Sequence, residues 1–135
     1  MNDRVVLERD FAVPQTRLWR ALTTGALLAE WLMDNDFQPV AGHRFQFCRP
    51  PMPHWDGVVQ AQVMQVTPET QLTIAWDTGD LQTTLSFTLT PIETGVRLLF
   101  EQSGFGPDQL RNRNGAIYGW KQNLDRLDAL LTKET

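Results

Sequence analysis

The chain has 135 residues, of which 41% are hydrophobic, and this length suits one domain with a single core. It carries 12 basic and 16 acidic residues without a block of like charge, for a formal net charge of −4. A nucleic-acid binder needs a basic surface that neutralises phosphates, so we expect no nucleic-acid partner.

The amino-terminal segment and the cysteine content predict the cellular compartment. The segment MNDRVVLERDF reaches charged residues too early for a signal peptide, and no apolar run approaches the roughly 20 residues needed to span a bilayer. The single cysteine, Cys48, cannot form an internal disulfide, and beside Phe47 it is typical of a small hydrophobe rather than a nucleophile. We therefore predict a cytoplasmic protein without a membrane partner.

The first elements are one strand and two short helices. Alternating apolar residues in VVLERDFAV, residues 5–13, predict a strand in which Arg9 shares the apolar face. Pro14 ends this pattern and suits the first turn of a helix through PQTRLWRALT. The next segment, ALLAEWL, has the three- and four-residue spacing of a second short helix, which directs Trp31 towards the core.

The middle of the chain alternates with period two and is punctuated by turn residues, which predicts antiparallel strands. We expect these strands at approximately 42–49, 55–66, 71–78, 81–90 and 95–103. In the last of them, Gln102 has the parity of Phe100 and therefore points to the same side, whereas Glu101 points to the other.

The segment AIYGWKQNLDRLDALL, residues 116–131, predicts a long amphipathic helix. Its apolar side chains fall within a narrow arc: Ile117, Trp120, Leu124, Leu127 and Leu131. We expect this arc to pack on the sheet, because an antiparallel sheet needs a cover for its apolar face. Residues 107–114 are expected to lead into the helix with a break near NRNG, and Tyr118 should be exposed.

Five segments of the sequence resemble one known family. RDFAVPQTRLWRALTTGALLAEWL resembles the opening signature of the START-like (SRPBCC) branch called activator of heat-shock-protein-90 ATPase-like. AGHRFQF, VTPETQLTIAW, GVRLLFEQSGF and GWKQNLDRLDALL are similar to later segments of that family, in the same order, and the match covers nearly the whole chain.

The resemblance implies an α+β helix-grip fold, in which a curved antiparallel sheet of about six to seven strands wraps around a long carboxy-terminal helix. It also implies a single ligand-binding domain over residues 1–135, with a cavity used across the superfamily for lipids, polyketides and other hydrophobic molecules. The name of the family suggests a role in the stress response.

One departure from the family pattern affects chemistry. Relatives often have His-Ser-Gly-Phe after the last strand, where this chain has Gln102, Ser103, Gly104 and Phe105. An amide donates and accepts hydrogen bonds but does not titrate, so general acid–base catalysis is not available at that position.

Other catalytic constellations are incomplete. His43 and His54 lie beside turn residues without a cysteine or clustered carboxylates at ligand spacing, so we expect no metal site. Ser86 and Ser103 have no base at hand for nucleophilic hydrolysis. The segment SGFGPD lacks the third glycine and the lysine of a phosphate-binding loop.

Aromatic side chains from several elements, with two polar ones, are the candidates for a ligand pocket. They are Arg9, Trp31, Phe47, Trp55, Trp76, Phe87, Phe100, Gln102, Phe105, Ile117 and Trp120. For Trp76 and Trp120 a plain aromatic core explains the pattern at least as well. Trp55 follows a stiff proline-rich segment that could hold it at an entrance.

Arg9 needs a partner, because an unpaired cation on an apolar face is costly. We favour a salt bridge to an acidic neighbour such as Glu101 or Asp77, and the alternative is a contact with a ligand carboxylate.

The sequence therefore predicts a domain that binds an aromatic or acyl-containing hydrophobic small molecule without a cofactor. Two alternatives stay open: a polyketide-cyclase-like or detoxifying enzyme that acts by positioning its substrate, and a module that interacts with a chaperone. We identify no titratable catalytic constellation. A homodimer formed through edge strands also stays open.

Overall fold

The computed structural model describes residues 4–53, 55–79 and 81–133. In these residues a seven-stranded antiparallel sheet has the strand order β1-β7-β6-β5-β4-β3-β2. The strands are β1 (Arg4–Phe11), β2 (Asp34–Asn35), β3 (Arg44–Cys48), β4 (Val58–Thr67), β5 (Gln71–Thr78), β6 (Leu81–Ile92) and β7 (Gly95–Ser103), and the helices are α1 (Gln15–Thr23), α2 (Gly25–Trp31) and α3 (Leu110–Lys133).

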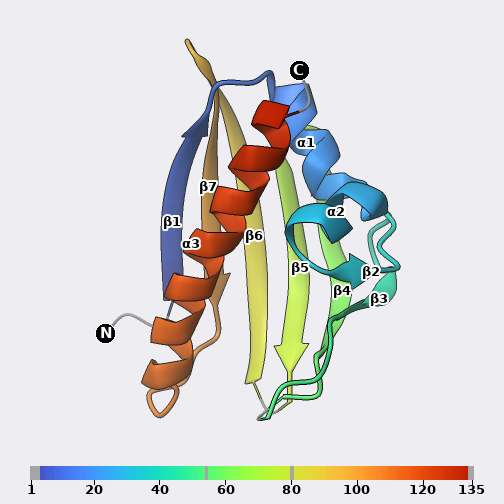
Figure 1. Cartoon of the computed structure of the whole chain (residues 1–135), viewed down its shortest axis with the longest axis vertical. Helices are drawn as coiled ribbons and strands as arrows, with labels where there is room; N and C mark the ends of the chain where they lie inside the picture. Colours follow the sequence, from blue (N-terminus) through green and yellow to red (C-terminus); the bar gives the residue numbers. More distant parts are fainter. Residues whose placement is uncertain (1–3, 54, 80, 134–135) are drawn as a thin grey trace.

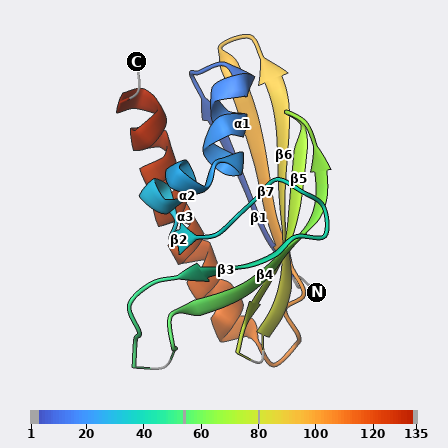
Figure 2. The same cartoon turned by 90° about the vertical axis from the view of Figure 1, so that its right-hand side faces the viewer.

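All three helices lie on one side of the sheet, as the two views in Figures 1 and 2 show. The sheet curves so that β3 and β4 bend towards α3 at the lower end of Figure 2. A register shift between Val63 and Gln65 in β4 adds to this bend, because a bulge increases the local twist of a strand. The α+β helix-grip fold predicted from the sequence is confirmed.

The core lies between the sheet and the three helices. Val5 and Phe11 of β1 and Leu124 and Leu127 of α3 are 2% exposed or less, in agreement with the predicted faces of these elements. Leu130 is also buried, although it lies outside the predicted arc, and Tyr118 is exposed as expected.

The start of α3 differs from the prediction. The helix begins at Leu110 and runs without a break through NRNG. Before it, Gln109 donates its backbone N–H to the Gly106 carbonyl, and the Gly106 N–H bonds to the Gln109 side chain, which closes a turn. Arg113 donates to the Arg4 carbonyl of β1, which fastens the first turn to the sheet. These contacts offset the low helix propensity of asparagine and glycine, which costs up to about 1 kcal/mol per residue.

Some smaller features also differ. The two-residue strand β2 was not predicted, and β4 begins at Val58 rather than at residue 55. Cys48 is exposed rather than packed as a hydrophobe, because Phe47 points inward and the next residue of a strand must point outward. His54 lies outside the described residues.

The salt bridge predicted for Arg9 is confirmed, but the two partners suggested for it, Glu101 and Asp77, are wrong. Its guanidinium pairs with the carboxylate of Asp125 on α3, and Glu101 instead pairs with Arg4. Arg9 shares the inner face of β1 and reaches the helix that covers this face, so its partner comes from across the layer rather than from a neighbouring strand. Asp125 remains largely solvent-exposed, so the pair contributes at most about 1 kcal/mol to stability.

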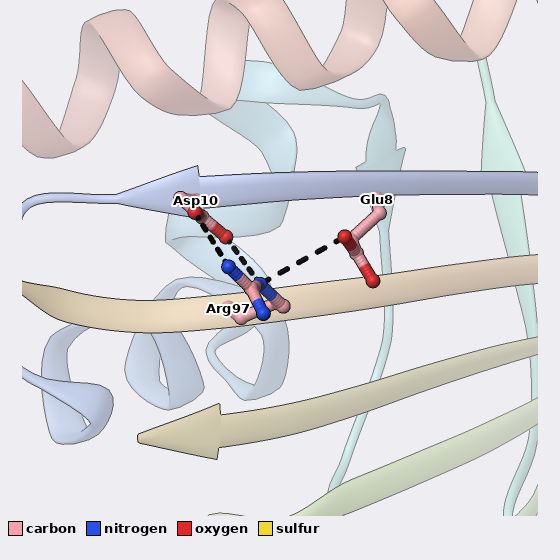
Figure 3. Close-up of polar contacts among 3 residues, drawn as sticks. All are labelled: Glu8, Asp10 and Arg97. Atoms are coloured by element: carbon pink, nitrogen blue, oxygen red, sulfur yellow. Dashed lines mark hydrogen bonds and ion pairs between the residues drawn. The ribbon is translucent and has the colours of Figure 1, made fainter. Parts of the chain in front are cut away.

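Another ion pair, between Arg97 and Asp10, lies on the outer face of the sheet (Figure 3). Arg97 Nε and Nη2 donate to the two carboxylate oxygens of Asp10 at 2.7 and 3.1 Å, and Glu8 lies 3.8 Å from Arg97 Nε. The hydrogen bond from Arg97, aided by the charge of its guanidinium, holds the pKa of Asp10 below its ordinary value.

We predict a pH-dependent stability difference for the Asp10→Asn variant. A carboxyl whose pKa is lowered on folding stabilises the protein above its unfolded pKa, and this stabilisation is lost as the pH falls through the folded pKa. Asp10→Asn should therefore melt slightly below the wild type at about pH 7, and this gap should shrink as the pH falls below the ordinary range of a carboxyl group. Glu8→Gln is the control, because Glu8 lies farther from Arg97 than Asp10 does, and its difference in melting temperature from the wild type should be smaller. A gap for Asp10→Asn that persists in acid would contradict this assignment.

Gly57 provides a second test of the fold. Its φ is +84°, and an added Cβ would lie 2.1 Å from the Arg49 carbonyl oxygen, so no other residue fits without movement of the backbone. Gly42 also has a positive φ, +91°, but an added Cβ would meet nothing within 4 Å. We expect Gly57→Ala to lower the free energy of unfolding by about 1–3 kcal/mol more than Gly42→Ala, measured by urea denaturation. Equal losses would show that the contact with Arg49 relaxes freely.

Candidate functional site: a pocket between α3 and the sheet

A pocket of about 630 Å³ lies between the first half of α3, the inner face of the sheet and the β5–β6 turn. Its size falls within the range of roughly 300–1,000 Å³ that is typical of small-molecule sites. It is lined by Met33, Trp55, Val59, Trp76, Thr78, Gly79, Leu81, Gln102, Phe105, Asn112, Ala116, Gly119, Trp120 and Asn123. None of these described lining residues carries a charge.

Trp120 of α3 forms the floor of the pocket and anchors the helix. Its ring centroid lies 4.4 Å from that of Phe100 and 5.5 Å from that of Trp76, and Trp31 and Phe87 pack against it at 6.5 and 6.2 Å. Aromatic pairs at such distances contribute about 0.5–1.5 kcal/mol each beyond the area they bury. The floor is therefore a rigid aromatic surface.

Trp55 and Phe105, which lie in loops, form two walls of the pocket. Trp55 exchanges two backbone hydrogen bonds with Met52, and its indole Nε1 donates to the Val58 carbonyl at 3.1 Å. Gly104 has φ of +111°, which turns the chain sharply after β7 and brings Phe105 back over the pocket, where it is 3% exposed.

Gln102, which lines the pocket, and Thr83, which does not, are buried polar residues, 2% and 4% exposed. Gln102 Nε2 donates to Thr83 Oγ1 at 2.9 Å, and Thr83 Oγ1 donates to the Trp76 carbonyl oxygen at 2.6 Å. Gln102 Oε1 is buried and has no hydrogen-bond partner among the described residues. An unpaired buried acceptor costs about 1–3 kcal/mol.

The structure brings together five of the residues predicted for the site and separates the others from it. Trp55, Trp76, Gln102, Phe105 and Trp120 line the pocket. Trp31, Phe47, Phe87 and Phe100 are 2% exposed or less and form the core behind its wall. Ile117 packs against the core beside the pocket, and Arg9 is paired with Asp125 outside the lining.

Sequence reasoning missed nine lining residues, namely Met33, Val59, Thr78, Gly79, Leu81, Asn112, Ala116, Gly119 and Asn123. The signal on α3 was available in part, since residues 112, 116, 119 and 123 recur at three- and four-residue intervals and share a face. These residues are small or polar, so a search for apolar periodicity passes over them.

The pocket offers aromatic surface and hydrogen bonds rather than titratable groups. Ser86 and Ser103 are absent from its lining, and so is His43, whose Nε2 contacts the Asp36 carbonyl and whose ring stacks on Phe45. In the described part of the chain, no three His, Cys, Asp or Glu residues cluster in a way that could hold a metal ion. Within the same residues, no helix is long and apolar enough to cross a membrane.

Several solved structures share this fold. MLL2253 from Mesorhizobium loti is 43% identical with a TM-score of 0.92, and the match covers 98% of each chain. BH1534 from Bacillus halodurans is 25% identical with a TM-score of 0.81, covering 95% of this chain and 96% of that one.

DynU16, a protein of the dynemicin biosynthetic locus, is 20% identical with a TM-score of 0.82. The match covers 98% of this chain but 48% of DynU16, so this chain spans about half the length of that protein and shares its fold.

The sequence itself matches one family model. A search of curated proteins found no significant match. The model of the Activator of Hsp90 ATPase homolog 1-like protein family matches residues 12–132, which includes every segment on which the resemblance rests except residues 9–11 at the end of β1. The chain therefore belongs to the Activator of Hsp90 ATPase homolog 1-like family, within the START-like superfamily whose members bind hydrophobic ligands.

Proposed function

We propose that the protein binds a neutral, hydrophobic small molecule, aromatic or acyl-containing, in the pocket between α3 and the sheet. The observation that carries the proposal is the lining itself, in which three tryptophans and Phe105 surround about 630 Å³ without a charged side chain among the described residues. Apolar walls with a few polar groups are the usual composition of a ligand site.

The shape of α3 supports this proposal. Near Trp120 the helix is held tightly to the sheet by aromatic packing, but Ala116 and Gly119 present almost no side chain to the pocket. An added Cβ on Gly119 would meet nothing within 4 Å, although glycine within a helix costs about 1 kcal/mol relative to alanine. A helix whose only task was to fill the space above the sheet would gain stability from a larger residue there.

The uncharged lining formed by the described residues also bears on the alternatives. An enzyme that used this pocket would have to act by holding its substrate in a reactive shape, since no titratable side chain of the described lining can transfer a proton. The name of the family raises Hsp90 as a partner, and binding to that chaperone without any pocket ligand would favour the interaction module.

Native mass spectrometry of freshly purified protein tests the proposal directly. We expect a species heavier than the polypeptide that loses a small molecule on denaturation, or a ligand-free protein that gains mass when 2-naphthol is added. The same spectra report the oligomeric state, for which a homodimer is the open alternative. If the protein binds no apolar probe from a library of aromatic alcohols, ketones and acyl compounds, the proposal is wrong.

Gly119→Leu should block the pocket without damaging the fold. The leucine side chain would occupy space beside Trp120, so we expect the Kd for 2-naphthol, measured by calorimetry, to rise about tenfold or more, or 1.4 kcal/mol. Gly115→Leu is the matched control, because Gly115 is also in α3 and open at Cβ but does not line the pocket. Both variants should melt at or above the wild-type temperature, because leucine has the higher helix propensity. Equal affinities in the two variants would contradict the proposed site.

A further inference from the structure

We infer that the pocket selects ligands that carry a hydrogen-bond donor, such as an aromatic hydroxyl or N–H group, and that Gln102 Oε1 is the acceptor that recognises it. This inference rests on the proposed function and adds the chemical class of the ligand. It starts from Gln102, which lines the pocket and is 2% exposed, and whose Oε1 has no partner among the described residues.

The hydrogen-bond chain behind the pocket determines which end of the amide is left unpaired. The Trp76 carbonyl can only accept, so Thr83 Oγ1, at 2.6 Å, donates its single proton to it. Thr83 Oγ1 can then only accept from Gln102, and this requires the Nε2 end of the amide to face it, as observed at 2.9 Å. The reversed amide would place two acceptors against each other. The free end of Gln102 is therefore an acceptor, and its complement is a donor.

The position of this acceptor allows it to distinguish ligands that carry a hydrogen-bond donor from ligands that do not. Gln102 lines the pocket together with Trp76 and Phe105, and its oxygen is screened from bulk water. A ligand without a donor would leave the oxygen unpaired, whereas a ligand hydroxyl would satisfy it. Sites that bury a polar group reject analogues that cannot pair with it more strongly than apolar pockets reject an extra methylene.

The same geometry disfavours anionic ligands. A carboxylate placed against Gln102 Oε1 would bring together groups that both only accept. No cation compensates for this among the described lining residues, and Arg9, for which a ligand carboxylate is the alternative partner predicted from the sequence, is paired with Asp125 outside the lining. The favoured class is thus a neutral aromatic alcohol or amine rather than an aromatic acid.

The test compares 2-naphthol with 2-methoxynaphthalene, which shares the ring system but has no donor. The Kd of each probe for the wild type and for Gln102→Met is measured by calorimetry. Comparing the four values as a cycle cancels the difference in hydration between the two probes. We expect the affinity ratio of naphthol to its methyl ether to fall about tenfold in Gln102→Met, because methionine keeps the length of the side chain and removes the acceptor. Binding of 2-naphthoate should be the weakest of the three probes in the wild type.

Thr83→Val provides a second variant outside the lining. Without the hydroxyl, the amide of Gln102 is free to turn its Nε2 towards the pocket, so the ether should gain affinity relative to naphthol while the walls stay the same. This variant keeps the inference testable if Gln102→Met folds poorly.

The outcomes separate the two proposals. Equal affinity ratios in the wild type, Gln102→Met and Thr83→Val would overturn the role of Gln102 and leave the pocket as a binding site. Failure of the wild type to bind any of the three probes would count against the proposed function, and the inference would fall with it.

Thermal stability gives an independent readout. If Gln102 serves ligand recognition rather than stability, Gln102→Met should raise the melting temperature by roughly 2–6 °C, because it replaces an unpaired buried acceptor with an apolar side chain. A glutamine kept only for structure would instead give a lower melting temperature on substitution.

Discussion

The packing of Trp120 against Phe100 is the contact on which the arrangement of α3, and with it the pocket, depends. The two rings lie 4.4 Å apart, and Trp120 also contacts Trp76, Phe87 and Trp31, so one residue of α3 meets three strands and α2. Towards the amino terminus of α3 the residues that line the pocket, Gly119, Ala116 and Asn112, are small or polar. The bulky residue holds the helix in place, and the small ones leave space beside it. The pocket is a direct result of this change in side-chain size along one helix face.

The pocket combines features that cost stability with features that secure it. The glycine at position 119 lowers the helix propensity of α3, and Gln102 Oε1 is buried without a partner in the described structure. Against these costs stand the aromatic floor and the hydrogen bonds that run from Gln102 through Thr83 to the Trp76 carbonyl. Such local costs inside an otherwise consistent fold are typical of functional sites.

Family membership and chemistry are separate conclusions here. The match over residues 12–132 and the likeness to MLL2253 establish the family and the fold. One fold can host many unrelated functions, so the ligand has to be argued from the site. In this chain the relevant facts are an uncharged described lining and an acceptor whose orientation follows from its neighbours, and together they favour recognition of a neutral donor over acid–base catalysis.

The sequence by itself determined the order of the main strands and helices and the inward direction of Gln102, because period-two and helical patterns report which face of an element is apolar. It also identified five residues that line the pocket. It could not distinguish them from Phe87 or Phe100, because an aromatic residue in the core and one in a pocket wall give the same pattern of apolar residues in the sequence. Only the tertiary structure decided that Arg9 meets Asp125, that α3 continues through NRNG and that Gly119 faces empty space. The first two depend on contacts between segments far apart in the chain, and the third on the space that such segments leave between them; local periodicity carries no information about either.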